Sequence, residues 1–470
     1  MSPRLPRGQA EQRGLRLWPV GRALTLAFTT AILVAGTVFY SAWHLLGARE
    51  LKPEHRIDSK TLFDLVKLSF GVVAGAGALV ALVVAYRRQR VDEDGAQRDA
   101  TRLHTERFTT AVSQLGDDSP AIRLGGVHAL AGLADDAPTR ELRQTCIDVL
   151  CAYLQLPFTP DPGDDPEHQE EHNRYLALRK VRHTILRLIG DHYQRPMGNP
   201  GSWQGCHLDL TGVTIDGDLD LGSACFTGAR VSFDSAIFSG GTVSFDSAIF
   251  SGGTVSFDSA IFSGGTVSFD SAAFSGGEVS FCKAAFSGGE VWFHSAAFSG
   301  GEVSFIGAAF SGGTVSFHRA AFSGGEVSFY SAAFSGGDVS FGNAAFSGGK
   351  VLFSAAFSGG DVSFHNAAFS GGEVWFGGAA FSGGEVSFHS ATFSGDRVWF
   401  NRSAFSGGDV SFHSAAFSAG TVTFRHATLS GGTVTFRQAT GTPPSGLVPA
   451  DGSPLPTGLL LPEAWYPTGQ

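Results

Sequence analysis

The chain contains little methionine, cysteine and charge. Two of its 470 residues are methionine, five are cysteine, and charged side chains make up 16% of the sequence, against about a quarter in an average soluble domain. The cysteines form no CxxC pair and no CxxC…HxxxH spacing, so neither a disulfide framework nor a zinc-finger site is expected. They are Cys146, Cys151, Cys206, Cys225 and Cys282. We expect five reduced thiols, as in a cytoplasmic protein.

Catalytic motifs are missing as well. The sequence has no Walker A loop, no GxSxG elbow and no GxGxxG after a strand pattern. One string, HQEEH at residues 168–172, matches the inverted zinc-peptidase motif HxxEH. It ends a linker rich in proline and aspartate, where a helix presenting both histidines is not expected. The chain is therefore predicted to be non-enzymatic, with no catalytic residues, no cofactor and no metal.

The net charge of −10 is unevenly distributed. The first hundred residues are rich in arginine, and the acidic excess lies further along the chain. A protein that binds nucleic acid directly needs an extended basic face. The large C-terminal part has no such excess of basic residues, so direct nucleic-acid binding is not expected there.

Two long apolar segments are present near the N-terminus. Residues 20–46 hold one charge, Arg22, and residues 62–86 hold Asp64 and Lys67 in their first two turns only. Each segment is long enough to cross a bilayer core of about 30 Å. A cleaved signal peptide is the alternative for the first segment, but no small-x-small cleavage site follows it. We predict two transmembrane helices that hold the protein in the lipid bilayer.

Arginines flank the outer ends of this hairpin, which places both termini in the cytoplasm by the positive-inside rule. Four basic residues in the short connection act against that orientation. The predicted location is therefore the cell membrane, as a multi-pass protein with cytoplasmic N- and C-termini.

Charged amphipathic patterns follow the hairpin and predict a small α-helical, HEAT-like region. A helix over residues 174–193 has apolar residues on one side and basic residues on the other, which we interpret as a solvated face. The expected organisation is a basic cytoplasmic tail (1–19), the transmembrane hairpin (20–90), the amphipathic helices (91–156), an acidic Pro-rich linker (157–171), a helix and N-terminal cap (172–206), a β-solenoid (207–440) and a Pro-rich tail or C-terminal cap (441–470).

A twelve-residue repeat fills the second half of the chain and explains its 63 glycines and 41 phenylalanines. After two five-residue units, LDLTG and VTIDG, the pattern becomes V-S-F-x-x-A-x-F-S-G-G-x, with eighteen copies from Phe233 to Phe436. One residue is missing in the copy that begins at Val351. Residues two apart in a strand share a face, so Val, Phe, Ala and Phe point inward and the polar pieces form corners. The glycine pair suits a corner with positive φ.

The number of residues per coil is either 12 or 24. We favour 24, because a coil of two copies encloses eight inward side chains whereas a coil of one copy leaves little room for two phenylalanines. Histidines in alternate copies support this choice. At about 4.8 Å per coil the solenoid would have nine to ten coils and be roughly 45 Å long. Its ends need caps, and the tail is either such a cap or disordered.

Two sets of outward residues are candidate binding sites. The residue before V-x-F is often acidic, at Glu278, Glu290, Glu302, Glu326, Asp338, Asp361, Glu373, Glu385 and Asp409. These carboxylates form a candidate acidic interaction surface or serve only for solubility, with Lys350 and Arg397 relieving repulsion. The histidines are His294, His318, His365, His389 and His413. Stacked imidazoles could bind a metal or sense pH. Gly342 interrupts their row and no carboxylate is expected beside it, so a metal site is disfavoured.

The units LDLTG and VTIDG, the FSGG-x-VSF array and the upstream segments SPAIRLGGVHALAGLADD and RQTCIDVLCAYLQLPF together resemble actinobacterial pentapeptide-repeat membrane proteins. The resemblance covers nearly the whole chain. It implies an all-β, right-handed quadrilateral parallel β-helix behind a membrane hairpin and a helical segment. The chain departs from the family pattern by its central phenylalanine, its frequent valine and its extra glycine-containing corner.

Two hypotheses about function follow. The first is a membrane-tethered scaffold whose solenoid binds a protein partner not identified by the sequence, with association of several copies of the chain also compatible. The second is an acidic, DNA-mimicking β-helix that binds a topoisomerase or another nucleic-acid-binding protein. The second requires a continuous acidic strip, so the arrangement of the carboxylates in space distinguishes the two.

Overall fold

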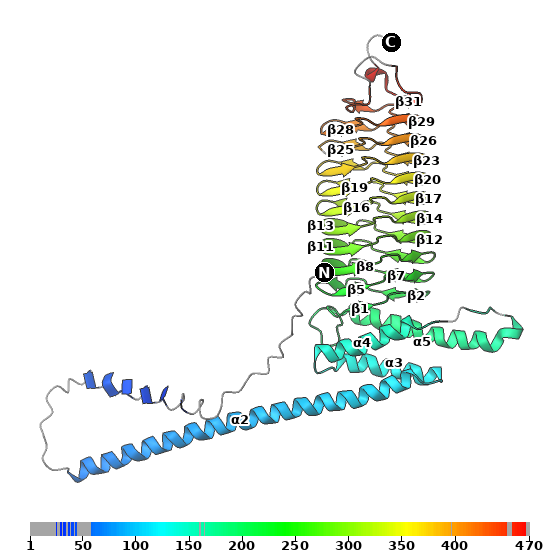
Figure 1. Ribbon diagram of the computed structural model, residues 1–470. Helices are drawn as coiled ribbons and strands as arrows, with labels where there is room; N and C mark the ends of the chain where they lie inside the picture. Colours follow the sequence, from blue (N-terminus) through cyan, green and yellow to red (C-terminus); the bar gives the residue numbers. More distant parts are fainter. Residues whose placement is uncertain are drawn as a thin grey trace, which may run out of the picture. The chain divides into compact units, whose positions relative to one another are not determined.

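The structure is a computed structural model that describes residues 58–158, 161–163, 165–395, 397–448, 454–466 and a set of separate residues between 25 and 44. The chain divides into two compact units, Met1–Arg102 and Leu103–Gln470. Figure 1 shows the helices and strands of both units.

The first unit contains most of helix α2 (Ser59–Leu115). Within the described residues, this is the one helix whose length and composition would allow it to cross a membrane. Most of the apolar side chains in the part of α2 that belongs to this unit are exposed, as at Phe63, Phe70 and Leu82. The first predicted span, residues 20–46, lies largely outside the described residues. Helix α2 continues through residue 90 without a break, although the sequence analysis places a boundary there.

The second unit begins with a group of helices. They are α3 (Pro120–Asp135), α4 (Arg140–Gln155), the 3-10 turn η1 (Pro166–His168) and α5 (Gln169–Tyr193). Thr139 caps α4 by accepting a hydrogen bond from the backbone N–H of Leu142. Helix α5 starts inside the segment that the sequence analysis assigns to a linker.

Helix α5 covers the first coils of the solenoid. It passes so close to them that a Cβ at Gly190 would lie 2.6 Å from the carbonyl oxygen of Asp220. Tyr193 and Trp203 are fully buried in this end, and the Tyr193 hydroxyl donates to the Cys206 carbonyl at 3.0 Å. These contacts cover the apolar end of the first coil, which has no preceding coil to bury it.

The interpretation of the basic face of α5 as solvated is wrong for Arg182. This guanidinium is buried, donates to the carbonyls of Leu154 at 2.8 Å and Thr214 at 3.3 Å, and lies over the Phe158 ring. Its hydrogen bonds join α5 to α4 and to the first coil, and buried carbonyls need such partners. The amphipathic pattern of α5 does not reveal these carbonyl partners, because they belong to α4 and to the first coil.

Arg179 and His183 of α5 bind a single carboxylate of the solenoid. Their nitrogens lie 2.7 Å and 2.9 Å from the Asp216 side chain. Burial alone would raise the pKa of Asp216, but the hydrogen bonds and charges of His183 and Arg179 hold it well below its ordinary value. The cap is thus joined to the solenoid by charge as well as by packing.

The solenoid consists of two stacks of short parallel strands. Sheet A contains β1 (Leu208–Asp209), β4 (Cys225–Phe226), β5 (Arg230–Ser232), β8 (Ile249–Ser256), β11 (Ala273–Ser280), β13 (Ala297–Ser304), β15 (Ala321–Phe322), β16 (Glu326–Ser328), β18 (Ala345–Phe346), β19 (Lys350–Leu352), β21 (Ala368–Phe369), β22 (Glu373–Trp375), β24 (Thr392–Phe393), β25 (Arg397–Trp399), β27 (Ala416–Phe417), β28 (Thr421–Thr423) and β30 (Thr440–Gly441). Sheet B contains β2 (Thr214–Ile215), β3 (Leu219–Asp220), β6 (Ile237–Phe238), β7 (Thr242–Ser244), β9 (Ile261–Phe262), β10 (Thr266–Ser268), β12 (Ala285–Trp292), β14 (Ala309–Ser316), β17 (Ala333–Ser340), β20 (Ala356–Ser363), β23 (Ala380–Ser387), β26 (Ala404–Ser411), β29 (Thr428–Thr435) and β31 (Leu459–Leu460).

The strand register confirms a coil of 24 residues. Val231 pairs with Val255, Val255 with Val279, and Val279 with Val303, each 24 residues further along. The register shortens to 23 where one residue is missing, between Val339 and Val362. Each coil therefore contains two copies of the repeat and passes once through each sheet, and the solenoid has about ten coils.

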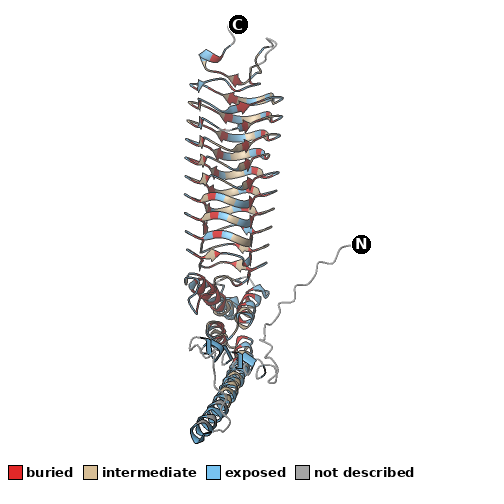
Figure 2. Ribbon diagram, turned by 90° about the vertical axis from the view of Figure 1, so that its left-hand side faces the viewer, coloured by how far each residue is buried: buried red, intermediate tan, exposed pale blue. Residues whose placement is uncertain are grey.

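The core is built from the predicted inward residues. Val267, Phe269, Ala272 and Phe274 of one copy are each at most 2% exposed. Phenylalanine rings stack from coil to coil, as in the pair Phe245–Phe269, whose centroids are 4.7 Å apart and whose planes differ by 3°. Neighbouring columns of rings meet edge to face, a favourable arrangement for aromatic quadrupoles. Figure 2 shows buried and exposed positions alternating along the strands.

Two kinds of corner connect the strand segments. At the glycine pair the second glycine has positive φ, as predicted, and a Cβ on Gly277 would lie 2.8 Å from the carbonyl oxygen of Gly253 in the preceding coil. The hydrogen-bond ladder continues across this corner with a register shift, so segments such as β11 are single eight-residue strands. The other corner, between Phe and Ala, is a tight turn whose second residue has positive φ, as at Ser247.

The C-terminal tail caps the last coil over the described residues 454–466. Strand β31 adds to sheet B by pairing with β29. Trp465 packs against Phe417 and Phe436 with ring centroids 5.6 Å and 5.7 Å away, and its indole N–H donates to the Gly441 carbonyl at 2.9 Å. Residues 454–466 therefore cover the end of the last coil, as the cap alternative for the tail would require.

Candidate interaction surfaces of the solenoid

Outward residues at equivalent positions of successive coils lie one above another. We call each such row, which runs along the solenoid axis, a column, and we call the residue that a single coil contributes to it a rung. The acidic residues before V-x-F, which the sequence presents as one set, divide between the two sheets. Sheet A holds Glu278, Glu302, Glu326 and Glu373. Sheet B holds Glu290, Asp338, Asp361, Glu385 and Asp409. The nine carboxylates therefore do not form one continuous strip.

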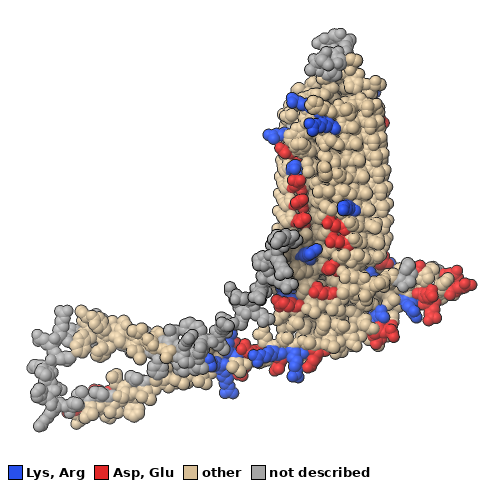
Figure 3. Space-filling model, viewed as in Figure 1, with Lys and Arg blue, Asp and Glu red and all other residues tan. Residues whose placement is uncertain are grey.

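The charged column of sheet A contains residues of both signs. Lys350 follows Glu326 and lies 3.4 Å from it, and Arg397 follows Glu373 and lies 3.1 Å from it. Each basic residue thus lies beside the acidic residue of the preceding rung, as relief of repulsion within this column would require. In Figure 3 one row of red and blue side chains runs along the left side of the solenoid, where Figure 1 places the strands of sheet A.

The acidic column of sheet B contains no basic residue on its rungs from Glu290 to Asp409. Thr314 separates Glu290 from Asp338, and Asp338, Asp361, Glu385 and Asp409 then occupy four consecutive rungs. Adjacent strands are about 4.8 Å apart, so these like charges raise each other's electrostatic energy. The structure thus gives sheet B a negative face and sheet A a mixed one.

The histidine column lies on the turns that follow the sheet B strands. The rings of His365, His389 and His413 stack in series with centroids 5.1 Å and 5.2 Å apart. The rings of His294 and His318 meet edge to face at 6.2 Å. Burial, and then the neighbouring His365 and His413, lower the pKa of His389. The charge of the His389 ring therefore depends on the charge of its neighbours.

The expectation that no carboxylate lies in the histidine column is wrong. Asp270 occupies the rung directly before His294, and its carboxylate lies 3.5 Å from the His294 Nδ1. A 24-residue step along the sequence would have found this neighbour. No group of three or more metal-ligating side chains occurs among the residues that the structure describes. Parallel stacked rings also direct their lone pairs within their own planes rather than toward one shared ion.

Sequence reasoning missed a partly exposed apolar strip on sheet A. The residue after valine is usually serine, but on three consecutive rungs it is Leu352, Trp375 and Trp399. The two indole rings lie 4.1 Å apart. Tyr330 and Ile306 on the adjoining turns are 55% and 39% exposed. We name these five residues the apolar strip. Their departure from the repeat consensus was the signal that could have found them.

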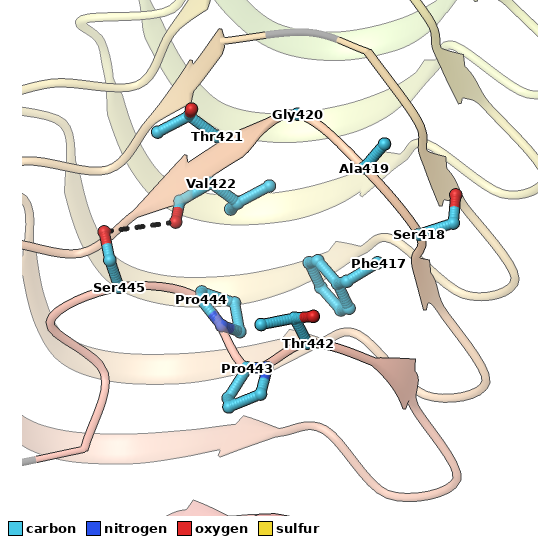
Figure 4. Close-up of a pocket in the computed structure, with 10 residues that line it drawn as sticks. All are labelled: Phe417, Ser418, Ala419, Gly420, Thr421, Val422, Thr442, Pro443, Pro444 and Ser445. Atoms are coloured by element: carbon cyan, nitrogen blue, oxygen red, sulfur yellow. Dashed lines mark hydrogen bonds between the residues drawn. The ribbon is translucent and has the colours of Figure 1, made fainter.

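A hollow of about 240 Å³ lies at the C-terminal end of sheet A (Figure 4). It is lined by residues 417–422 and 442–445, none of which is charged. The Ser445 hydroxyl donates to the Val422 carbonyl at 3.5 Å. Pro443 and Pro444 stand where a further coil would continue, and proline supplies no N–H to extend a sheet. We interpret the hollow as the finished end of the solenoid and not as a catalytic site.

Burial suppresses the reactivity of two cysteine thiols, Cys146 and Cys151. Burial raises the pKa of Cys146 to about 11 and that of Cys151 to about 12, so both thiols stay protonated at neutral pH. His172 of the HxxEH string directs its Nδ1 at Asp161, 2.7 Å away.

Comparison with known proteins gives no relative for this chain: no family model matches it. No curated protein matches it. No solved structure matches it either. The function is therefore inferred from the surface chemistry of the solenoid.

Proposed function

We propose that the protein is a non-enzymatic scaffold that presents the faces of its β-solenoid to protein partners. The observation that carries the proposal is the contrast between inward and outward positions of the repeat. Inward positions keep Val, Phe, Ala and Phe in nearly every copy, whereas the outward positions vary between acidic, basic, aromatic and small residues. A rigid core with a varied surface is typical of repeat proteins that bind other macromolecules.

We further propose that the scaffold is tethered to the cell membrane by two transmembrane helices, with both termini in the cytoplasm. The exposed apolar stretch of α2 supports one such helix, since exposed apolar residues at this density favour lipid over water. The resemblance to pentapeptide-repeat membrane proteins supports the second. By the same resemblance we propose a right-handed coil with a quadrilateral outline.

Cell fractionation tests the tether. The full chain with a C-terminal tag is expected in the membrane pellet after carbonate washing. Protease added to intact cells is expected to leave the tag uncut, and protease added to opened cells is expected to remove it. Recovery of the chain in the carbonate supernatant, or cleavage of the tag from outside, would contradict the proposed anchor or its orientation.

Crosslinking in cells tests the scaffold. Proteins crosslinked to the full chain are expected to depend on the solenoid surface. Changing Asp361 and Glu385 to their amides should release partners of sheet B, and Trp375→Ser should release partners of sheet A. A set of captured proteins that no surface variant changes would contradict the proposal.

A second candidate is the acidic β-helix that imitates DNA and binds a topoisomerase. The four-rung acidic column of sheet B favours it, because regularly spaced carboxylates can bind a nucleic-acid-binding surface. A supercoiling assay with purified topoisomerase and the full chain tests it. Inhibition that disappears when the four carboxylates become amides would support this candidate, and no inhibition would contradict it.

A further inference from the structure

Four consecutive rungs of the charged column of sheet A alternate in sign. Glu326, Lys350, Glu373 and Arg397 are successive register partners in the parallel ladder. Each basic side chain pairs with the acidic one before it, yet all four remain at least partly exposed. An alternating row of exposed charges can pair with a second row that runs in the opposite direction.

A dimer in which the charged column of one copy faces the same column of a second copy requires a particular symmetry axis. A two-fold axis that lies in the plane of the contact, perpendicular to the solenoid axis, reverses the order of the rungs and keeps each column facing its equivalent. With that axis between the rungs of Lys350 and Glu373, Lys350 faces Glu373 of the second copy. Glu326 faces Arg397 of the second copy. All four pairs across the axis then join opposite charges.

We infer that sheet A is the contact face of an antiparallel homodimer whose two-fold axis passes between the rungs of Lys350 and Glu373. The inference gives sheet A a definite partner, a second copy of this chain. It does not depend on the membrane tether of the proposed function. Sheet B cannot form the equivalent dimer, because its acidic column would face itself with like charges.

The apolar strip lies beside the charged column and is covered by the same operation. Trp375 faces Leu352 of the second copy, and Trp399 faces Ser328 of the second copy. Trp375, Trp399 and Leu352 are partly exposed, and burying the remaining apolar surface of such side chains favours association in water. The indole N–H of Trp375 is buried and has no acceptor among the described residues, so a partner surface could supply one.

The remaining outward side chains of sheet A allow close contact over a sufficient area. Most are alanine, serine or glycine, as in the strand AFSGGEVS of β11. With the axis in this position about eight rungs overlap. At about 4.8 Å per rung and roughly 20 Å across the strands, each copy contributes about 800 Å². This equals the area that each partner contributes to a standard stable interface.

Sedimentation of the full chain in detergent micelles tests the dimer. The wild type should sediment as two chains of 49.2 kDa at micromolar concentration. Glu373→Lys places like charges opposite each other at two pairs, so the dissociation constant should rise about tenfold or more. Adding Lys350→Glu to Glu373→Lys makes all four pairs across the axis opposite again, and the dimer should return.

This double variant separates association from stability. Along the four rungs of one chain, the single variant and the double variant have the same charge neighbours. Each has two neighbouring pairs of like charge and one neighbouring pair of opposite charge. A purely intramolecular effect would therefore weaken both variants equally. Recovery of the dimer in the double variant supports the inference, and equal loss in both overturns it. A wild-type chain that stays monomeric at micromolar concentration also overturns it.

A tryptophan pair supplies the matched control for the apolar strip. Trp375→Ser and Trp292→Ser each restore the residue that most copies carry at this position, so both should fold. Trp375 lies on sheet A and Trp292 on sheet B. Trp375→Ser should weaken the dimer about tenfold while Trp292→Ser leaves it unchanged. Equal effects of the two would overturn the assignment to sheet A.

The dimer and the proposed function can fail separately. A negative result in the carbonate fractionation or in the crosslinking would contradict the proposed function and leave the dimer unaffected.

Discussion

Sheets A and B have the same interior and different exteriors. Val279 of sheet A and Val291 of sheet B are equally buried, but the column before each valine is mixed in sign on sheet A and negative on sheet B. A parallel ladder stacks identical positions about 4.8 Å apart, so any residue repeated at the coil period is amplified into a stripe. The surface chemistry of the solenoid therefore depends on which copies of the repeat lie in the same sheet. The core does not depend on this, because nearly every copy contributes the same inward residues.

The largest expected effect tests whether the two interiors are equivalent. Phe346→Ala in β18 and Phe334→Ala in β17 each remove a ring that is 1% exposed. Each should lower the free energy of unfolding by about 3–5 kcal/mol, through lost burial and the cavity left behind. Thermal unfolding of the full chain, with hydrogen exchange on the adjacent coils, measures the loss. A difference of more than about 1 kcal/mol between the two would break the equivalence.

The glycine corners should be equally intolerant in both sheets. Gly325 and Gly337 have φ near +70°, and a Cβ on either would approach a backbone oxygen of the preceding coil within 2.6 Å. Substitution by alanine should cost about 2 kcal/mol or more, from the left-handed conformation and the clash. Thermal unfolding of each variant tests this. Gly378, where a Cβ would meet nothing within 4 Å, is the control and should lose less.

Neutralising one carboxylate should have opposite effects on the two sheets. Asp361→Asn on sheet B removes repulsion from Asp338 and Glu385, and should raise the free energy of unfolding by up to about 1 kcal/mol. Glu373→Gln on sheet A removes a partner of Arg397 and should lower it by a similar amount. Both changes should shrink in high salt. Denaturant titration at low and high salt checks the signs, and equal signs would contradict the contrast.

The smallest effect concerns the histidine column on the turns after sheet B. The folded-state pKa of His389 is lowered, so the unfolded chain takes up a proton first as the pH falls. The contribution of His389 is therefore complete above its unfolded pKa of about 6.5 and is lost as the pH falls toward the folded value. His389→Asn should flatten the fall in melting temperature between pH 7 and pH 5. An unchanged pH profile would show that the stacking does not affect protonation.

Periodicity predicted most of the fold because the repeat is long and its inward residues are apolar. The positions of Val, Phe, Ala and Phe, the glycine corner with positive φ and the 24-residue coil all follow from side-chain alternation and volume. The first coils and the surface were harder. Arg182 was interpreted as solvated, since its carbonyl partners on Leu154 and Thr214 belong to other elements. Asp270 was overlooked beside His294 although it stands one coil before it.

The sequence by itself determined a parallel solenoid with a phenylalanine core, because the repeated apolar residues are buried when successive coils stack on one another. It left the coil length at either 12 or 24 residues and so did not settle which outward residues share a face. That depends on the coil length, on the shift at each glycine pair and on the missing residue near Ser354, which together set the register. Only the tertiary structure divided nine carboxylates into two columns and brought Trp375 beside Trp399, because these contacts join residues that are 24 positions apart in the chain.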